Sequence, residues 1–494
     1  MEHYLLQGFV FTIGLLVLAV IILIIIDISQ TKDAIRKNFP ALGRFRYLFI
    51  KLGVFFRQYF FAMDREEMPF NRAEREWISR AANDYDNTVA FGSTKNLNAP
   101  GTVIFVNCPF PTLDQDSMEI PSLKIGPYCN HPYDAPSIFN ISGTSYGSIS
   151  IPAVQALSKG ARLAGCWLNT GEGGLTSYHL EGGCDIVMQI GTAKYGVRND
   201  QGELCDRKLK EVAAHEQVKM FEVKLSQGAK PGKGGMLPGV KVTSEIAKIR
   251  GIPEGKDSIS PNRHPEINSV ETLLDMIVHI RDVTGKPTGF KTVIGGDSWL
   301  EDMCEEIHKR GIENAPDFIT VDSGDGGTGA APMPLMDNVG LVIKESLPLV
   351  SDILHKYNLR KRIRLICSGK LITPSEVAWA IASGADFVTS ARGFMFSLGC
   401  IQALNCNKNT CPTGIATHNT RLQKGLNPED KAVNVANYCK NIVHEVETIS
   451  HSCGVARPRL MDRRHIRIVQ VNSRSIPMDE LFPRPDVLPD YKHK

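Results

Sequence analysis

Residues 317–330 read DFITVDSGDGGTGA, a short apolar run followed by a loop rich in glycine. The run Asp317–Val321 has the length of a strand. The loop after it contains four glycines in the six residues from Gly324 to Gly329. Glycine lets backbone N–H groups approach an anion closely, because no Cβ stands in the way. This stretch therefore predicts a strand that carries an anion-binding loop at its C-terminal end.

Short apolar runs like this one recur along the chain, and helical patterns follow several of them. The predicted strands are Ile138–Ser142, Leu163–Asn169, Asp185–Ile190, Phe221–Leu225, Gly289–Ile294, Asp317–Val321, Ile363–Cys367 and Asp386–Thr389. The predicted helices are Pro152–Ala161, Val270–Val283, Trp299–Arg310, Pro374–Ser383 and Ala432–Ile449. Such an alternation predicts an α/β fold, a (β/α)8 TIM barrel, whose chemistry lies on the loops at the strands' C-terminal ends. A doubly wound open sheet is the competing architecture, but its G-x-G-x-x-G motif follows none of these strands.

The composition is that of a large folded protein. The 494 residues include 56 Lys and Arg against 53 Asp and Glu, a formal net charge of +3. About 43% of the residues are hydrophobic and 22% are charged, which excludes disorder, collagen and coiled coil as the main architecture. The near-neutral balance gives no reason to expect a nucleic-acid partner. Twelve cysteines in a chain of this length do not indicate a secreted disulfide scaffold.

The N-terminal segment is apolar enough to cross a membrane. Residues 5–26 carry no charge, and as a helix they extend about 33 Å, against ~30 Å for a bilayer core. No Lys or Arg precedes the segment, whereas seven follow it: Lys32, Arg36, Lys37, Arg44, Arg46, Lys51 and Arg57. The positive-inside rule then predicts a single-pass anchor in the inner (cytoplasmic) membrane, with the rest of the chain in the cytoplasm. A cleaved signal peptide is the main alternative, but a basic n-region and a small-residue cleavage site are lacking.

The segment after the anchor leaves two interpretations open. Residues 47–63 mix Phe55, Phe56, Phe60 and Phe61 with Lys51 and Arg57. Such a segment either lies along the membrane surface or packs on the soluble domain.

Two more predicted strands end in loops that suit an anion. They are followed by Ser368-Gly369-Lys370 and by Ser390-Ala391-Arg392-Gly393. In barrel enzymes the loops after strands seven and eight commonly hold a phosphate group. Each loop alone is also compatible with a tight turn. Together with the glycine-rich loop they predict a phosphorylated cofactor, complemented by Lys370 and Arg392.

Two further loops carry ionisable groups near predicted strand ends. Residues 227–239, from Gln227 to Gly239, hold Lys230 and Lys233 among five glycines. Such a loop suits an anionic substrate or a flavin ring, although a flexible surface lid is the competing interpretation. In Asn169-Thr170-Gly171-Glu172-Gly173-Gly174 the single ionisable side chain is Glu172.

Three cysteines lie within twelve residues: Cys400, Cys406 and Cys411, the last followed by Pro412. Thiolates are the natural ligands of iron–sulfur clusters, and a proline often follows such a ligand. A zinc site would need a fourth ligand, for which His418 is the nearest candidate. The spacing favours an iron–sulfur cluster over zinc, and both over three structural thiols.

The segment from Ile141 to about Leu422 resembles the FMN-binding synthase domain of glutamate synthases. The resemblance rests on motifs in the family's order and spacing, which are Ile141–Ser150, Asn169–Gly174, Gln189–Val197, Gln227–Gly239, Ile259–Pro261, Ser323–Ala330 and Gly399–Gly414. It implies FMN and a [3Fe–4S] cluster as cofactors, with Cys400, Cys406 and Cys411 as the cluster ligands. The residues expected to contact FMN are Ser142, Thr144, Ser145, Gly147, Gln189, Lys291, Asp325, Gly326, Gly327, Gly369, Lys370, Ser390, Ala391 and Arg392.

The resemblance also implies an activity. Members reduce 2-iminoglutarate, formed from 2-oxoglutarate and ammonia, to glutamate, and electrons pass from the cluster to FMN and then to substrate. The expected catalytic residues are Lys291, Gln227, Lys230 and Glu172, with Lys230 and Lys233 holding substrate carboxylates and Lys291 stabilising the reduced flavin.

The chain departs from the family pattern in several places. The first 140 residues leave no room for a glutaminase domain, and no nicotinamide-binding motif occurs. Leu175 and Thr176 replace acidic positions, and Met236 replaces a polar one. The expected partners are therefore 2-oxoglutarate or a related keto acid, ammonia or an amine, and a ferredoxin-like or membrane redox donor. The alternative function is a membrane-tethered electron-transfer protein or an amino-transferring enzyme acting on a different keto or imino acid.

These expectations divide the chain into four parts. They are a transmembrane anchor at 1–30, a basic juxtamembrane segment and N-terminal extension at 31–137, the FMN-binding barrel at 138–422 with its iron–sulfur segment at 399–414, and a C-terminal helix with an extended tail at 423–494.

Overall fold

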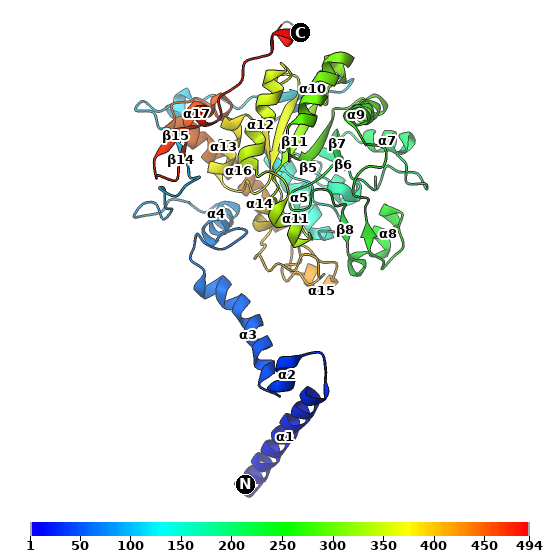
Figure 1. Ribbon diagram of the computed structural model, residues 1–494, viewed down its shortest axis with the longest axis vertical. Coiled ribbons are helices and arrows are strands. Elements are labelled where there is room, and N and C mark those ends of the chain that lie inside the picture. The colour runs from blue at the N-terminus through cyan, green and yellow to red at the C-terminus, as the bar shows by residue number, and fades with distance from the viewer. Residues whose placement is uncertain (1, 493–494) are drawn as a thin grey trace. The chain divides into compact units, whose positions relative to one another are not determined.

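Eight parallel strands close into a barrel in the computed structural model, which describes residues 2–492 (Figure 1). The strands follow one another around the ring in chain order: β4 (Phe139–Ile141), β5 (Leu168–Asn169), β6 (Ile186–Ile190), β7 (Val218–Lys224), β10 (Thr288–Val293), β11 (Phe318–Asp322), β12 (Arg364–Ser368) and β13 (Phe387–Ser390). Strand β13 pairs with β4, with Ser390 opposite Ile141, and this pairing closes the ring. The predicted (β/α)8 barrel is confirmed.

The barrel strands are mostly apolar because both of their faces are covered. Every residue of β11 is buried, and the same holds for β6 and β10. Such strands lack polar alternation, which explains why continuous apolar runs identified them. The predicted run Leu163–Asn169 was too long, since the preceding helix continues to Ala164 and ends at Gly165 with a left-handed φ of 71°.

Helices cover the outside of the barrel, and their ends carry the expected capping residues. The helices of the barrel unit that lie beyond residue 150 are α5 (Ile151–Ala164), α6 (Ser177–Glu181), α7 (Asp206–Ala213), α8 (Ser244–Arg250), α9 (Val270–Thr284), α10 (Ser298–Arg310), α11 (Met333–Asn338), α12 (Ile343–Lys356), α13 (Pro374–Ser383), α14 (Arg392–Ser397), α15 (Thr420–Gln423), α16 (Pro428–Ser452) and α17 (Met478–Leu481). Ser150 caps α5 by accepting from the Ala153 N–H, and Thr373 forms a capping box with Glu376 at α13. The five predicted helices are all present.

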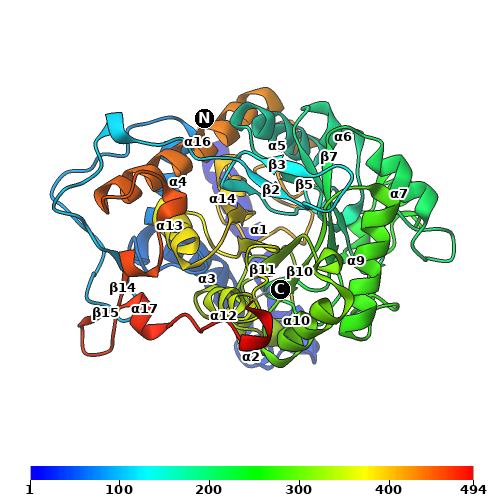
Figure 2. The same cartoon turned by 90° about the horizontal axis from the view of Figure 1, so that it is seen from above.

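A hairpin closes the end of the barrel at which the strands begin. It consists of β2 (Leu123–Ile125) and β3 (Tyr133–Ala135) (Figure 2). The apolar side chains of the hairpin join one buried cluster with Trp167 and Phe387. This packing leaves the opposite end, where the strands' C-termini lie, for the functional loops.

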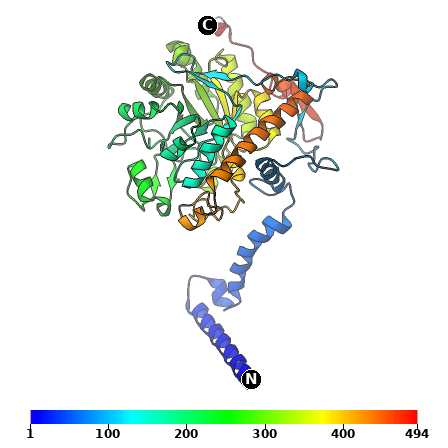
Figure 3. The same cartoon turned by 180° about the vertical axis from the view of Figure 1, so that it is seen from behind.

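The long helix α16 packs against α5 on the outside of the barrel (orange and teal in Figure 3). The two helices approach closely at Gly160, where an added Cβ would meet Cγ1 of Val435 at 2.4 Å. The remaining strands form small sheets: β1 (Val103–Phe105) with β14 (Ile466–Val469) and β15 (Ser475–Pro477), and β8 (Met236–Leu237) with β9 (Ser258–Ile259). Residues 455–494 are therefore not simply an extended tail, since part of this segment adds two strands beside β1.

The chain divides into two compact units, one ending at Ala73 and the other beginning at Glu74. The first unit contains α1 (Glu2–Ser29), α2 (Ala34–Asn38), α3 (Gly43–Phe56) and the π-helical turn η1 (Arg57–Phe61), and α4 (Arg72–Ala82) bridges the boundary. By length and composition, residues His3–Ser29 of α1 could span a membrane, and the most apolar part of this helix is not buried. Signal sequences pass the same test of length and composition.

Candidate active site

Loops from six barrel strands meet at the C-terminal end of the barrel and line two adjoining cavities. The first, here called the mouth cavity, is lined among others by Ser142, Gln189, Lys291, Gly369, Lys370 and Ser390. The second, the cysteine-side cavity, is lined among others by Thr144, Glu172, Lys230, Met236, Cys400, Cys406 and Cys411. Gln189, Lys224, Gln227, Gly327, Ala391 and Arg392 line both. The two cavities therefore share walls and form one candidate site.

The floor of the mouth cavity is a buried set of charged and polar groups. The Lys291 ammonium lies 3.1 Å from the Asp322 carboxylate. Burial by itself would lower the pKa of Lys291. The negative charges of Asp322 and Glu222 have the larger effect, so the pKa is raised. Glu222 in turn accepts hydrogen bonds from Asn169 at 2.8 Å and Gln189 at 2.7 Å, and from a neighbouring threonine. Lys291 is therefore a fixed, charged group at the base of the cavity.

Glu172 and Lys224 form an ion pair where the two cavities meet. Their carboxylate and ammonium groups lie 3.0 Å apart, and Lys224 also donates to the side-chain oxygen of Gln227. Burial alone would raise the pKa of Glu172, but Lys224, Lys230 and Arg250 together lower it, so the carboxylate is ionised. These contacts link the loop after β5 to the end of β7 and to the loop that follows β7.

Lys230 is a buried cation in the wall of the cysteine-side cavity, 5% exposed. Burial is the main cause that lowers its pKa, and Lys224 and Lys233 lower it further while Glu172 opposes them. Lys233, from the same loop, is exposed and lines neither cavity. The loop therefore aims one of its two lysines into the site.

The loops after β7 and β11 are in close backbone contact. The Gly228 N–H donates to the Asp322 carboxylate at 2.9 Å, and the Ala229 N–H donates to the Gly324 carbonyl at 2.9 Å. A Cβ at Gly228 would lie 2.3 Å from the carbonyl oxygen of Ser323. Position 228 therefore has no room for a side chain, as the glycine-rich sequence motif suggested.

The loop after β12 takes an unusual backbone conformation. Gly369 and Lys370 both have left-handed φ angles, 111° and 55°. A Cβ at Gly369 would meet the Ser323 side chain at 2.4 Å. The Lys370 ammonium pairs with Asp325 at 2.9 Å, and Asp325 also accepts from Ser323. Backbone N–H groups and a cation are consequently held together at this rim of the mouth cavity.

Arg392 stands between the mouth cavity and the three cysteines. Its guanidinium donates to the Thr328 carbonyl, and one of its nitrogens lies 3.8 Å from the sulfur of Cys406. A second cation, Lys241, donates to the Ser148 carbonyl at 2.5 Å and to the Cys406 carbonyl at 3.3 Å. Burial lowers the pKa of Lys241 to about 8. Two basic side chains therefore border the cysteine group.

The cysteines line one cavity, and all three are free thiols. Among residues 2–492, no three His, Cys, Asp or Glu side chains converge closely enough to hold a single metal ion. His418, the fourth ligand considered for zinc, instead has its Nε2 within 2.9 Å of the Gly147 carbonyl oxygen. At Cys411, burial is outweighed by the Thr413 hydroxyl and by backbone N–H groups, which lower the thiol pKa. The three cysteines therefore line one cavity as free thiols, and His418 is engaged elsewhere.

Most residues predicted from the sequence come together here, and four line neither cavity: Gly147, Lys233, Asp325 and Gly326. Gly147 and Asp325 instead accept hydrogen bonds from site neighbours, and Gly326 adjoins Gly228. Sequence reasoning missed Lys224, Lys241 and Glu222, all buried at the site. Lys224 and Glu222 belong to a strand that was predicted too short, and a charged residue in an apolar strand was the signal for both.

A separate cleft of about 620 Å³ lies between α9 and α10, lined by Trp299, Glu271 and Lys309 among others. None of the predicted site residues lines it. It is therefore not part of the candidate active site.

Comparison with known proteins assigns the chain to a family. Residues 111–456 match the conserved region in glutamate synthase. The chain belongs to the glutamate synthase family. It is accordingly an oxidoreductase of glutamate-synthase type.

One relative is similar over nearly its whole length and others over only part of theirs. The glutamate synthase large subunit-like protein YerD of Bacillus subtilis (strain 168) is 38% identical, over 98% of this chain and 99% of that protein. The archaeal-type glutamate synthase [NADPH] of Thermotoga sp. (strain RQ2) is 36% identical, over 63% of this chain and 58% of that protein. The archaeal glutamate synthase [NADPH] of Methanocaldococcus jannaschii is 34% identical, over 67% of this chain and 61% of that protein. The match covers little more than half of each of these two synthases.

Proposed function

We propose that this chain is an FMN- and iron–sulfur-dependent oxidoreductase that reduces 2-iminoglutarate, formed from 2-oxoglutarate and ammonia, to glutamate. The observation that carries the proposal is the shared wall between the mouth cavity and the cysteine-side cavity. This arrangement brings the Gly369–Lys370 turn, a buried lysine and three thiols to one end of one barrel. Family membership supports the same reaction class.

The residues of the mouth cavity fit an FMN molecule. The backbone at Gly369 and Lys370, together with Arg392, would hold the phosphate, and Lys291 would lie beneath the ring system. The Thr144 hydroxyl, which lines the adjoining cavity, is buried and has no hydrogen-bond partner within the described chain. An unpartnered buried hydroxyl at this place is explained by a polar ligand.

The cysteine group fits an iron–sulfur cluster of three ligands. Cys400, Cys406 and Cys411 would each donate one thiolate, and Lys241 and Arg392 would offset the negative charge that thiolates bring into a buried site. When bound, FMN would supply hydride transfer and the cluster single-electron transfer.

The chain's own residues would bind and orient the substrate. Lys230, a buried cation in the cavity wall, would pair with a carboxylate of the keto acid. The ion pair of Glu172 with Lys224 would hold Gln227 and the neighbouring loop in place. Buried walls exclude bulk water and strengthen these interactions.

A second candidate substrate is a keto or imino acid other than 2-oxoglutarate. Met236 lines the cysteine-side cavity beside Leu237, so part of the wall near Lys230 is apolar. A keto or imino acid with an uncharged side chain would bury its apolar atoms against Met236. A screen of keto acids and amines distinguishes the two substrates, because glutamate-forming activity should exceed all others under the first proposal.

We also propose that α1 anchors the enzyme in the cytoplasmic membrane and that its electrons come from a ferredoxin-like or membrane redox donor. The apolar character of α1 supports the first part, and the lack of a nicotinamide-binding motif supports the second. Alkaline extraction of membranes tests the anchor, since a spanning helix stays in the pellet.

The proposal is tested with full-length protein purified in detergent under anaerobic conditions. Absorption should reveal a flavin, and electron paramagnetic resonance should reveal an oxidised three-iron signal that Cys406→Ser abolishes. Protein that cannot be loaded with FMN would refute the proposal. A flavin without a cluster signal would remove the iron–sulfur part and leave the hydride chemistry.

Turnover with a reduced ferredoxin then tests the substrate site. Lys230→Met should lower kcat/KM for 2-oxoglutarate about 10- to 100-fold, because a hydrogen bond to a charged group contributes about 1.5–3 kcal/mol. Lys233→Met is the matched control, since Lys233 belongs to the same loop but is exposed. Equal effects of the two changes would contradict the role given to Lys230.

A further inference from the structure

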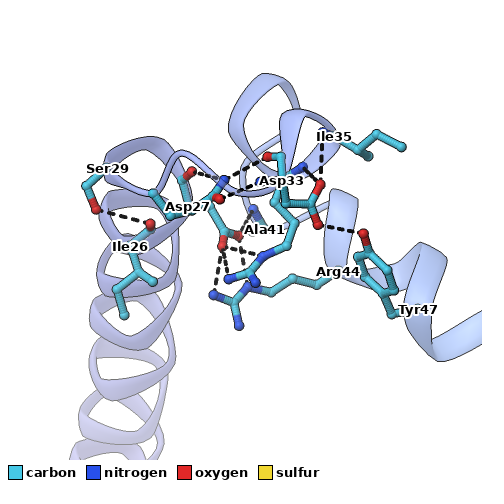
Figure 4. A network of polar contacts seen from close by, with 10 residues as sticks. Ile26, Asp27, Ser29, Asp33, Ile35, Ala41, Arg44 and Tyr47 are labelled. Carbon is cyan, nitrogen blue, oxygen red and sulfur yellow. Dashed lines mark hydrogen bonds and ion pairs between the residues drawn. The ribbon is translucent and has the colours of Figure 1, made fainter.

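A buried carboxylate ties together the helices of the N-terminal unit (Figure 4). Asp27, the last charged residue of α1, has a fully buried side chain. Arg36 donates to it at 2.6 and 2.9 Å, and Arg44 donates at 2.7 and 2.8 Å. The Ala41 N–H adds a bond of 3.1 Å. We call Asp27, Arg36 and Arg44 the arginine clasp.

The clasp fixes where α3 begins relative to the end of α1. Arg36 belongs to α2 and Arg44 to the first turn of α3, so a single carboxylate links three helices. Gly43 reinforces the corner, because a Cβ there would lie 2.9 Å from the Ile35 carbonyl oxygen. Arg44 donates to both oxygens of the Asp27 carboxylate, and Arg36 places two donors on Oδ1. Such paired contacts restrict orientation more than single contacts do. The chain therefore leaves α1 through a defined corner.

Helix α3 presents its broadest apolar stripe along one side, while Tyr47, Ile50 and Val54 are exposed around the rest of the helix. Six residues at helical spacing form it: Phe45, Leu48, Phe49, Leu52, Phe55 and Phe56. Their exposed fractions range from 38% at Leu52 to 65% at Phe49. A contiguous exposed patch of this kind marks a surface that binds something apolar.

Positive charge surrounds the stripe. Residues 27–57 contain seven Lys and Arg but only two acidic residues, Asp27 and Asp33. Asp27 is paired within the clasp, and Asp33 caps α2 while accepting from the Tyr47 hydroxyl at 2.5 Å. An apolar helical face with basic flanks is the pattern of helices that lie in an anionic membrane interface.

We propose that α3 lies in the surface of an anionic lipid bilayer, with its apolar stripe in the acyl boundary and the arginine clasp holding it at that depth. The inference rests on the proposed membrane anchor, because the clasp directly follows the apolar segment of α1. A bilayer is favoured over a second copy of this chain, since a second copy would bring the same excess of positive charge to the stripe.

Tryptophan scanning of the full-length protein in vesicles tests the proposal. Leu52→Trp lies on the stripe, whereas Val54→Trp lies two residues on, about 200° around the helix. The four native tryptophans all lie beyond Ala73, and the wild-type protein provides their background. Brominated phosphatidylcholine in vesicles that contain phosphatidylglycerol should quench Leu52→Trp at least about twofold more than Val54→Trp.

Each outcome of this experiment bears on one part of the proposal. Protein that does not float with vesicles refutes the anchor and the surface helix together. Protein that floats while neither tryptophan is quenched keeps the anchor but places α3 against protein, which overturns the inference. Equal quenching at both positions means that α3 enters the bilayer core, and this also overturns it.

Two comparisons separate the roles of charge and clasp. Vesicles of phosphatidylcholine alone should reduce the quenching of Leu52→Trp, and undiminished quenching would refute the need for anionic lipid. Adding Asp27→Asn should make the quenching of the two tryptophans more nearly equal. Without the carboxylate, Arg36 and Arg44 lose their shared ionic partner, and the orientation of α3 is no longer fixed. An unchanged contrast would show that the clasp does not set the depth of α3.

Discussion

At the scale of single residues, buried charges define the candidate site more than the glycine motifs do. Lys291, Lys224 and Glu172 lie on three different barrel elements, and each is paired with an opposite charge. Burial of any one of them alone would disfavour its charged form. The sequence identified Lys291 and Glu172 through the family resemblance, but their partners depended on which loops meet in space.

His264 makes the fold sensitive to acid. Its Nε2–H donates to the Lys224 carbonyl at 3.1 Å, and burial lowers its pKa to about 4 from 6.5. The unfolded chain therefore binds a proton below pH 6.5 that the folded chain refuses, so stability falls as the pH drops from about 6.5 toward 4. For this group the loss approaches roughly 3 kcal/mol at low pH.

Urea unfolding of wild type and His264→Gln across this pH window measures the effect. The variant should show a smaller dependence of the unfolding free energy on pH, while His215→Gln, at an exposed histidine, serves as the control. A dependence as steep in His264→Gln as in wild type would contradict the assignment.

At the scale of elements, the loops at the strand ends act as packed units and not as flexible connections. In the loop after β7, the Ala229 N–H donates to the Gly324 carbonyl of the loop after β11. Their glycines differ in purpose: Gly228 is hemmed in by backbone atoms, whereas Gly329 has no heavy atom within 4 Å of an added Cβ. The sequence motif alone treats the two as equivalent.

This contrast predicts different costs for the same substitution. Gly228→Ala should destabilise the protein by about 1–3 kcal/mol, as overpacking does, and should weaken FMN binding because the two loops must separate. Gly329→Ala should change stability by less than about 0.5 kcal/mol. Denaturant unfolding and flavin retention on gel filtration measure both, and a Gly228→Ala protein that matches Gly329→Ala in both respects would refute the packing argument.

At the scale of the whole molecule, binding of FMN should stabilise the barrel, because the cofactor would contact loops from strands on all sides of the ring. A ligand that binds the folded state at a concentration of 100 times its Kd adds about 2.7 kcal/mol to the unfolding free energy. Riboflavin, which lacks the phosphate, should add less at equal concentration.

Thermal unfolding of apoprotein with each ligand checks this prediction. The difference between FMN and riboflavin should shrink in Lys370→Gln and in Arg392→Gln, since these side chains border the proposed phosphate site. Equal shifts of Tm by the two ligands in the wild-type protein would mean that the phosphate is not bound where we propose.

The barrel and most of the residues at its mouth were predictable from the sequence, because they depend on chain order. Eight apolar runs in succession specify a barrel, and any loop after such a run reaches the same end. Local patterns also located the aromatic and basic segment 47–63 and the three cysteines.

Only the tertiary structure decided which charges meet. The ion pair of Glu172 with Lys224 and the pairing of β1 with β14 join residues far apart in the chain. The clasp around Asp27 joins residues that are closer in sequence but belong to three helices. Their energies depend on distance and burial, which periodicity and spacing do not encode. The sequence by itself therefore determined where functional groups are carried, and folding determined which of them are paired, buried and held in position.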